Sequence, residues 1–327
     1  MIVAGGAHGV AVFFVISGYL ITTLLLREFR KTGSLSLGRF YFRRTLRIFP
    51  PFYIYLAVMA IVWYLGIIPE LLSSFLAAAS YTWSLDPNAS GYYLTHSWSL
   101  SIEELFYLFW PLAFLWAHRS KKVIQLSFGL ILGMPFLRVA SYFVFPSLRG
   151  HEGYMVQGWI DTMMVGCLLA LLKDRAGWQR WHARYVNGWT AGAMAFTGFF
   201  VVPWVQTSLP RKLGSLFYLS TSFTITALCI GGVLIYLVEH PNTWAGRFMN
   251  NAILRHVGVL SYSLYLWQQP FLHQDLHLVP YGYLYTFAAA EISFWLIEKP
   301  SFRVREYLEQ RWAKRASRPA FGLGENH

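Results

Sequence analysis

Long apolar stretches alternate with short polar segments along almost the whole chain. Nine of them come close to the length of roughly 20 residues that crosses a bilayer as a helix. They cover approximately residues 10–26, 48–66, 98–117, 123–145, 156–172, 187–206, 213–238, 257–273 and 281–297. A further apolar piece, about 70–83, is too short to span comfortably, and we interpret it as a re-entrant or interfacial helix. The pattern predicts an all-α fold, a polytopic helical bundle embedded in a membrane.

The composition agrees with a membrane protein. Of the 327 residues, 56% are hydrophobic and only 13% are charged, whereas a soluble domain carries about 25% charged residues. Cys167 and Cys229 both lie inside apolar runs, so neither a disulfide framework nor a metal site is expected. We see no linker and no appended soluble domain. The chain is therefore predicted to form one transmembrane domain over residues 1–305, followed by a polar cytoplasmic tail over residues 306–327.

The net charge of +12 would also suit a nucleic-acid-binding protein, but the basic residues sit in short clusters between apolar stretches. That is the positive-inside pattern of a membrane protein, so nucleic acid is excluded as a partner. The basic clusters occupy residues 27–47, 118–122, 173–186, 239–256 and the segment after 298. The alternate segments, 84–97, 146–155, 207–212 and 274–280, are poorer in Lys and Arg and together hold only Arg149, Arg211 and Lys212. The alternation predicts an outside N-terminus and a cytoplasmic C-terminus.

The first candidate site is the arginine cluster of residues 40–51. Arg44 and Arg47 are three positions apart, so they share one helix face, and Arg43 lies beside them. Paired guanidinium groups bind phosphate oxygens bidentately, which would suit a phosphate-bearing cytoplasmic donor such as an acyl-CoA. The alternative is ordinary anchoring to anionic lipid headgroups.

The second candidate site is a polar stripe in residues 96–111. On a helix, one stripe collects His96, Ser99, Glu103, Tyr107 and Trp110. Glu104 would point about 100° away from that stripe. Carboxylates inside a span are costly unless they face a polar cavity or a partner. His96, Glu103 and Glu104 are therefore candidates for proton exchange, and structural hydrogen bonding is the alternative.

Other polar residues inside the spans are candidate substrate contacts. Arg138 and Asp161 should lie at similar depth in consecutive spans, either as an intramembrane ion pair or as part of the cavity that Glu103 lines. Ser17, followed by Gly18, would allow close helix approach in mid-span. Gln268 lies near the outer end of its span.

These candidates are distributed asymmetrically across the predicted membrane. The phosphate-type arginines lie at the inner face, whereas the buried acids, His96, Arg138 and Gln268 lie on the outer side. A protein that takes an activated group from the cytoplasm and delivers it outside would be built in this way.

Five blocks of the chain resemble, in order and spacing, those of the acyltransferase-3 family of membrane O-acetylases that modify lipopolysaccharide and other surface carbohydrates. The blocks are residues 9–21, 40–51, 97–111, 261–270 and 298–300. The resemblance implies ten-odd helices in the bacterial cytoplasmic (inner) membrane. It also implies an acyl-CoA, by default acetyl-CoA, as co-substrate with no permanently bound cofactor, and a carbohydrate or glycolipid acceptor.

The resemblance also assigns residues. Arg44 and Arg47 match the Arg-x-x-Arg pair linked to the CoA donor, and Ser17, Trp98 and Glu103 match other signature positions. In the family a histidine acts as general base on the sugar hydroxyl, and Glu103 would orient that base.

The chain departs from the family pattern at several positions. The family's essential histidine follows an arginine or lysine by about ten residues in a first span, and this chain has no such span, so we expect one upstream of Met1. Ala11 stands where many members carry Asp, and Gln268 where many carry His. His8 is expected to be an incidental loop residue. A glycolipid transporter or flippase without chemistry, and a truncated inactive relative, are the alternative interpretations.

Overall fold

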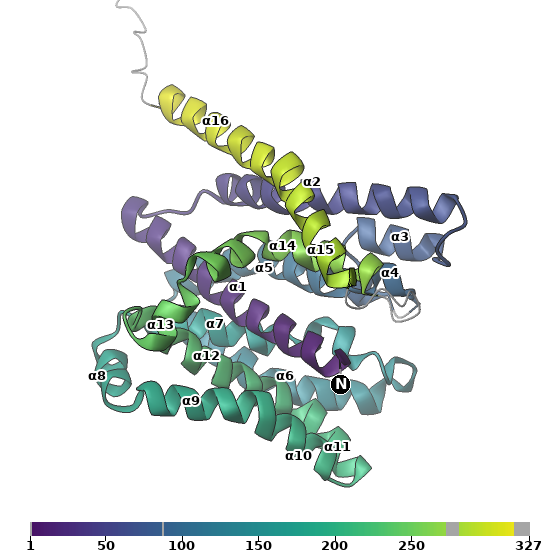
Figure 1. Cartoon of the computed structure of the whole chain (residues 1–327). Coiled ribbons are helices and arrows are strands. Elements are labelled where there is room, and N and C mark those ends of the chain that lie inside the picture. The colour runs from purple at the N-terminus through teal and green to yellow at the C-terminus, as the bar shows by residue number, and fades with distance from the viewer. Residues whose placement is uncertain (1, 87, 273–280, 317–327) are drawn as a thin grey trace, which may run out of the picture. The chain divides into compact units, whose positions relative to one another are not determined.

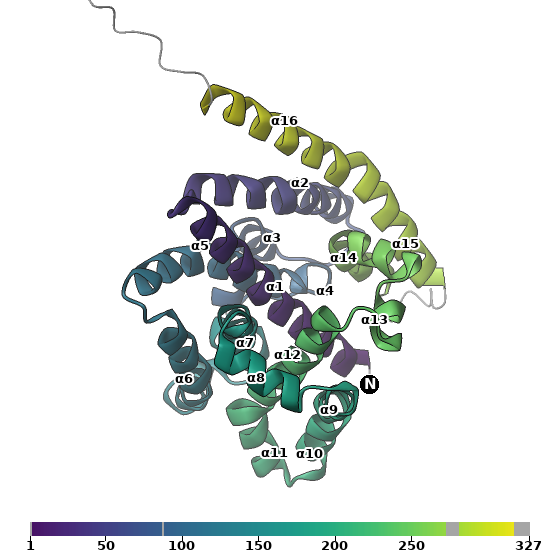
Figure 2. The same ribbon diagram turned by 90° about the vertical axis from the view of Figure 1, so that its left-hand side faces the viewer.

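The computed structural model describes residues 2–86, 88–272 and 281–316, and helices are the regular elements in this part of the chain. The predicted outer segment 274–280 and the end of the predicted tail, 317–327, lie outside the described residues. The chain divides into two compact units: Met1–Leu35 with Leu71–Arg255 form unit 1, and Ser36–Glu70 with His256–His327 form unit 2. Figures 1 and 2 show the course of the helices.

Unit 1 contains most of the helices. Its α-helices are α1 (Ile2–Thr32), α3 (Leu72–Ala79), α4 (Tyr92–Thr95), α5 (Ser97–Arg119), α6 (Val123–Val144), α7 (Ile160–Leu172), α8 (Ala176–Tyr185), α9 (Gly188–Phe196), α10 (Val202–Ser208), α11 (Arg211–Phe217), α12 (Phe223–Glu239) and α13 (Trp244–Met249). Short 3₁₀ turns are η1 (Trp83–Leu85), η2 (Pro146–Leu148), η3 (Glu152–Tyr154) and η4 (Val156–Gly158), and π turns are η5 (Thr197–Val201) and η6 (Tyr218–Ser222).

Unit 2 contains fewer and longer helices. They are α2 (Leu37–Tyr64), α14 (Ala252–Phe271, which begins in unit 1), α15 (Tyr281–Ser293), the π turn η8 (Phe294–Glu298) and α16 (Lys299–Ala316). The predicted boundary between residues 305 and 306 falls inside α16.

Six helices in the described residues are long and apolar enough to cross a membrane, so the predicted count of nine spans is not confirmed. The six are Gly6–Thr32, Leu37–Tyr64, Tyr92–Arg119, Val123–Val144, Gly188–Ser208 and Arg211–Glu239. The predicted span 156–172 contains α7, whose 13 residues reach only about 20 Å at 1.5 Å per residue. That is less than the roughly 30 Å hydrocarbon core. The predicted span 257–273 corresponds to α14, whose serine and glutamine residues lower its mean hydropathy.

Helix α1 is the centre of unit 1, where it contacts α5, α7 and α12 (Figures 1 and 2). Its approach to α7 depends on two glycines. A Cβ atom at Gly18 would overlap the backbone carbonyl of Met163, and one at Gly166 would overlap that of Val15. The prediction that Gly18 permits close helix approach is therefore confirmed, and small residues set the distance between the two helices.

The Gly18→Ala variant should be less stable than the wild type by about 1–3 kcal/mol, because its methyl group has no space against α7. Gly9 lies on the same helix, but a Cβ there meets no atom within 4 Å. The Gly9→Ala variant is thus the matched control and should melt no lower than the wild type. Thermal unfolding of both variants in detergent measures the difference, and equal melting temperatures would disprove the overlap at Gly18.

Two of the π turns interrupt consecutive long helices of unit 1. The turn η5 comes just before Pro203, which lacks an N–H and whose ring would clash with the carbonyl four residues earlier, that of Phe199. The turn η6 joins α11 to α12. Single π turns widen a helix locally and are frequent at functional sites. A functional site is therefore expected near η5 and η6.

Candidate functional site

The polar stripe predicted on residues 96–111 exists and is buried in unit 1. His96, Ser99, Glu103, Tyr107 and Trp110 are each at most 4% exposed. His96 is the N-cap residue of α5, and the others lie on that helix. Glu104 lies off the stripe and is only half-buried, as the helical spacing predicts.

Glu103 joins α5 to α1 through hydrogen bonds. Ser17 Oγ donates to Glu103 Oε1 at 3.0 Å, and the Tyr107 hydroxyl donates to the same oxygen and to Ser17 Oγ. Further along both helices, Trp110 Nε1 donates to Thr22 Oγ1 at 2.9 Å. The first and third sequence blocks, 9–21 and 97–111, are thus brought together in unit 1.

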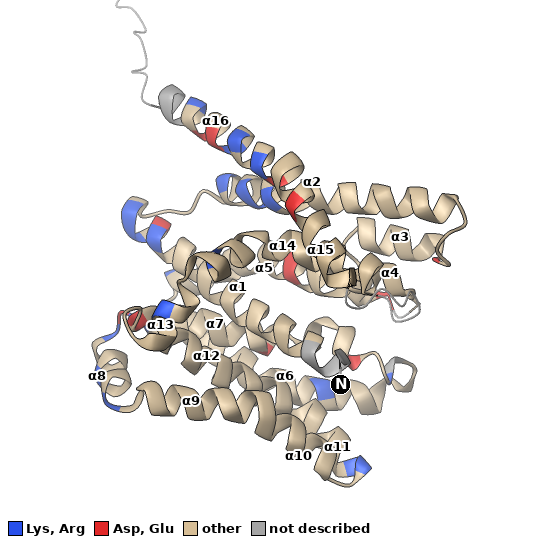
Figure 3. Cartoon of the chain, in the orientation of Figure 1, with Lys and Arg blue, Asp and Glu red and all other residues tan. Residues whose placement is uncertain are grey.

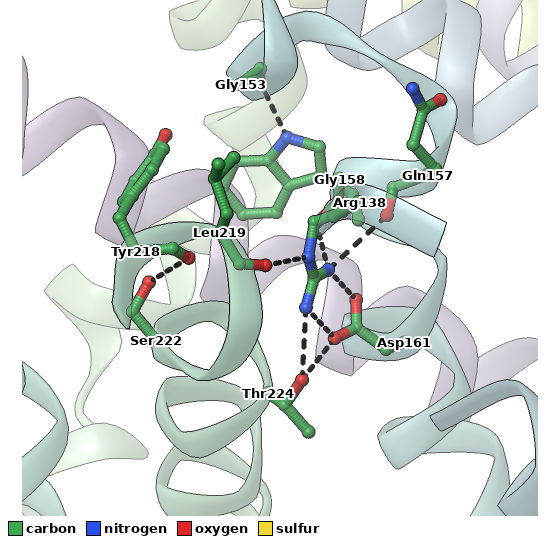
Figure 4. A network of polar contacts seen from close by, with 10 residues as sticks. Arg138, Gly153, Gln157, Gly158, Asp161, Tyr218, Leu219, Ser222 and Thr224 are labelled. Carbon is green, nitrogen blue, oxygen red and sulfur yellow. Dashed lines mark hydrogen bonds and ion pairs between the residues drawn. The ribbon is translucent and has the colours of Figure 1, made fainter. Parts of the chain in front are cut away.

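Arg138 and Asp161 form the buried ion pair that their positions predict. The pair is bidentate, with Nη1 to Oδ1 and Nη2 to Oδ2 both at 2.9 Å (Figure 4). Arg138 is 1% exposed and Asp161 0%. Thr224 Oγ1 donates to Asp161 Oδ2 at 2.5 Å, which ties α12 to the pair.

The remaining donors of Arg138 are also satisfied within unit 1. Nε donates to the carbonyl of Leu219 at 2.8 Å, Nη1 to that of Gly158 at 3.0 Å and Nη2 to Thr224 Oγ1 at 3.3 Å (Figure 4). The guanidinium also lies 5.0 Å from the centre of the Phe223 ring. Arg138 therefore holds α6, the start of α7, η6 and α12 together, which is a structural role; substrate binding by Arg138 and Asp161 stays a prediction.

A cavity of about 380 Å³ lies beside α1 in unit 1, bordered by η6 and by the helix that follows η5. Its lining is Ala7, His8, Ala11, Trp159, Val202, Pro203, Gln206, Thr207, Tyr218, Ser222, Phe223 and Thr226. Ring faces, hydroxyls, an amide and an imidazole meet there, which is the mixture that small polar ligands with an apolar face require. Tyr218 and Phe223 also border the Arg138–Asp161 network.

One correction concerns His8, which was expected in a loop. It lies in α1, because the helix begins at Ile2, and its ring stacks on Phe199 with centroids 5.3 Å apart. Among the described residues that line the cavity, it is the one histidine. Residues 8 and 17 of α1 are nine positions apart, about 14 Å along the helix, so Glu103 and its Ser17 contact lie away from this part of the lining.

The signature residue Trp98 connects the stripe of α5 to the cavity. Its ring lies 5.4 Å from that of Trp159, which lines the cavity, and 5.7 Å from that of Tyr154. Trp98 is therefore a buried neighbour of the cavity and is absent from its described lining.

In unit 2, the three arginines lie on the first turns of α2, where Figure 3 shows a concentration of basic residues. Arg43 Nε contacts Glu309 Oε1 on α16 at 2.6 Å. Arg47 interacts electrostatically with Glu298, which is 3% exposed. Arg43 and Arg47 are exposed and Arg44 is half-buried, so the cluster is accessible to a ligand.

The other three sequence blocks meet in unit 2. Ser263 Oγ donates to Glu298 Oε1, and the Tyr262 hydroxyl donates to the carbonyl of Ile48 at 2.9 Å. Gln268 is half-buried on the same helix as Ser263. Blocks 40–51, 261–270 and 298–300 therefore form a second cluster that contains the arginines.

Several residues of these sites were not predicted from the sequence. Gln206, Tyr218 and Thr226 lie in apolar stretches and belong to no recognisable motif. Nothing in the sequence around Thr224 indicated its contact with Asp161. The signal that could have indicated the cavity is Pro203, because a proline inside a long apolar stretch marks an irregular turn.

Comparisons with known proteins agree with the resemblance of the five blocks. A family model described as an acyltransferase domain matches residues 2–295. SACOL0978 of Staphylococcus aureus strain COL, which is named as an inferred O-acetyltransferase, is 30% identical over 339 residues, covering 90% of this chain and 52% of that protein. The O-acetyltransferase OatA of S. aureus strain NCTC 8325 / PS 47 is 29% identical over 334 residues, covering 91% and 53%. The chain spans about half the length of these relatives, and no solved structure matches it.

Proposed function

Because the chain belongs to the acyltransferase-3 family, we propose that it transfers an acetyl group from a cytoplasmic acyl-CoA to a hydroxyl group of a carbohydrate. The observation that carries this proposal is the family match over residues 2–295, which includes both the cavity of unit 1 and the arginines of unit 2. The O-acetyltransferase names of the relatives support acetyl as the group transferred.

The donor is assigned to the arginine cluster of α2. A CoA molecule carries several phosphate groups, and guanidinium forks on one helix face bind such groups bidentately. Arg44 and Arg47 provide that face, and Arg43 stands beside them with Glu309 as its present partner. The acyl-CoA acts as a co-substrate.

The acceptor is assigned to the cavity of unit 1. A sugar ring has an apolar face of C–H groups and a rim of hydroxyls, and the lining offers aromatic rings together with the side chains of Gln206, Ser222 and Thr226. A volume of about 380 Å³ is at the lower end of the range for small-molecule sites, which is near 300–1,000 Å³.

The reaction needs a base for the attacking hydroxyl, and His8 is the group in the cavity best suited to that role. The imidazole takes the hydroxyl proton while the oxygen attacks the thioester carbon. The carbon–sulfur bond then breaks, and the thiolate of CoA leaves and takes up a proton from the imidazolium. The helical spacing made Glu103, Glu104 and His96 candidates for proton exchange, and the family resemblance gave Glu103 the role of orienting the base; for these three residues a catalytic role stays a prediction.

The His8→Gln variant should lower kcat by about 100-fold, the lower end of what a general base contributes, while the KM for acyl-CoA changes little. His151 lies in a loop of unit 1 outside the described cavity lining. The His151→Gln variant is therefore the matched control and should keep wild-type kcat. Equal activity of the two variants would remove His8 from the mechanism.

The location proposed is the bacterial cytoplasmic membrane, with nine spans and a cytoplasmic C-terminus. Loop charges support this orientation through the positive-inside rule. Unit 1 contributes five of the six long apolar helices and unit 2 contributes α2.

The test is a double readout on the purified protein. It is incubated with labelled acetyl-CoA and an oligosaccharide acceptor, and both free CoA and labelled sugar are measured. An acyltransferase produces the two in equal amounts. A glycolipid transporter that uses the same cavity would release no CoA, and an inactive relative would give neither product, so either result would refute the proposal.

A further inference from the structure

The cavity of unit 1 continues into an open groove that ends at a basic side chain. The groove has a volume of about 440 Å³ and shares Gln206, Thr207 and Tyr218 with the cavity. Its other lining residues are Leu209, Arg211, Gly214 and Ser215. A ligand that occupies the cavity and extends outward along Tyr218 therefore reaches Arg211.

Arg211 is exposed, and within the described residues it has no hydrogen-bond or ion-pair partner. This differs from Arg138, whose donors are all satisfied, and from Arg149, whose guanidinium lies 4.8 Å from the ring of Tyr142. An arginine with open donors at the mouth of a cavity is suited to bind a planar or tetrahedral anion.

The position of Arg211 within unit 1 argues against ordinary lipid anchoring. Basic residues gather where α1 ends and around α8, whereas the tip of α11 lies at the other end of unit 1 (Figures 1 and 3). Segment 207–212 is predicted to face outward, yet it holds Arg211 and Lys212. The positive-inside rule does not account for cations at that end.

We propose that the acceptor is an anionic glycan, with one sugar ring in the cavity beside Tyr218 and a carboxylate or phosphate substituent on Arg211. This inference rests on the proposed function and specifies its substrate class. Carboxylate and phosphate share the recognition chemistry, because both accept two hydrogen bonds from one guanidinium. The pairing of this negative charge with Arg211 holds the glycan in one position, which determines which of its hydroxyl groups enters the cavity.

The experiment compares three acceptors in the acetyl-CoA assay: an oligosaccharide of glucuronic acid, the matched neutral oligosaccharide of glucose, and its phosphorylated form. Wild-type protein should show a lower KM for at least one anionic acceptor than for the neutral one. The Arg211→Gln variant should raise the KM for that acceptor about tenfold and leave the neutral one unchanged. The two anionic acceptors distinguish carboxylate from phosphate.

Lys212 provides the matched control, because it is the next residue, is exposed and carries the same charge, but is absent from the described lining of the groove. The Lys212→Gln variant should behave as the wild type with all three acceptors. The proposal is overturned if the two variants give the same KM values, or if the neutral oligosaccharide is the preferred acceptor. Preference for the neutral oligosaccharide is the result expected if the cavity and groove bind a neutral glycan or a lipid.

Direct binding of the labelled oligosaccharides separates this inference from the proposed function. If no acceptor is acetylated but the anionic one still binds in an Arg211-dependent way, the binding site stands and the acyltransferase proposal fails. If acetylation occurs but binding is independent of Arg211, the anionic-glycan proposal fails alone. Gel filtration of each variant confirms that it is folded.

Discussion

The Asp161→Asn variant is expected to yield little folded protein. The substitution leaves Arg138 charged and 1% exposed, with four other hydrogen-bond partners but no counter-charge. Removal of one partner from a buried ion pair costs about 3–5 kcal/mol, which is a large share of the roughly 5–15 kcal/mol that holds a protein folded. The loss should appear as a large drop in melting temperature and in the monodisperse fraction on gel filtration.

The chain offers a matched control for this variant. Arg30 and Asp174 also form an ion pair in unit 1, but both side chains are at least half exposed. The Asp174→Asn variant should cost at most about 1 kcal/mol, because exposed pairs contribute little. Replacing the whole buried pair by Arg138→Met with Asp161→Leu should recover part of the stability. If Asp161→Asn melts like Asp174→Asn, the ion pair does not hold unit 1 together.

The double variant Arg44→Ala with Arg47→Ala should raise the KM for acyl-CoA by about 1,000-fold. Each lost hydrogen bond to a charged group removes about 1.5–3 kcal/mol, and about 1.4 kcal/mol corresponds to a factor of ten. Arg47 also interacts with the buried Glu298, so the melting temperature of the variant is measured beside its KM. Initial rates at varied acyl-CoA concentration measure the effect.

A charge-matched control is the double variant Arg247→Ala with Arg255→Ala, which removes the same net charge from another predicted cytoplasmic segment. It should keep the wild-type KM. The Arg44→Lys with Arg47→Lys variant should lie between the two, since lysine keeps the charge but loses the bidentate geometry. A KM that follows net charge alone, whatever the position, would remove the donor site from α2.

Two parts of the site were predicted from the sequence. One is a set of residues at helical spacing on one helix, and the other is a pair of opposite charges on two adjacent helices. The stripe from His96 to Trp110 follows from helical spacing, and all five of its members are buried on one side of α5. The pairing of Arg138 with Asp161 follows from similar depth in adjacent spans and from the cost of a lone charge in a membrane. In both cases, burial of a polar or charged side chain without a partner costs so much free energy that few arrangements are possible. The sequence pattern alone was therefore sufficient to predict the arrangement.

The cavity could not be predicted, because its one local signal, Pro203, indicates an irregular turn but not which distant segments pack around it. It lies beside the π turn Tyr218–Ser222 and beside the residues that follow the π turn Thr197–Val201, and such turns depend on packing between distant segments. The length of α7 was missed for a similar reason. Gln157 and Gly158 lie in a 3₁₀ turn, and the carbonyls of both residues accept hydrogen bonds from Arg138. Because of that tertiary contact, α7 begins only at Ile160, later than its composition indicates.

The structure shows which of the five sequence blocks contact each other, and their order along the chain did not indicate this. Blocks 9–21 and 97–111 meet through Ser17 and Glu103 in unit 1, and the other three blocks meet through Tyr262 and Glu298 in unit 2. The proposed acceptor cavity lies in unit 1, as the first cluster does, and the proposed donor arginines belong to the second cluster, in unit 2. This division gives each half of the reaction its own group of helices.

We propose that the donor and the acceptor approach the protein from opposite faces of the membrane. It can be tested by labelling single cysteines with a membrane-impermeant maleimide, after Cys167 and Cys229 are replaced by alanine. We expect Arg39→Cys, next to the donor arginines, to react only in inverted vesicles, and Lys212→Cys, next to the groove, to react only in intact cells. Labelling of both positions from the same face of the membrane would contradict the proposal that donor and acceptor approach from opposite faces.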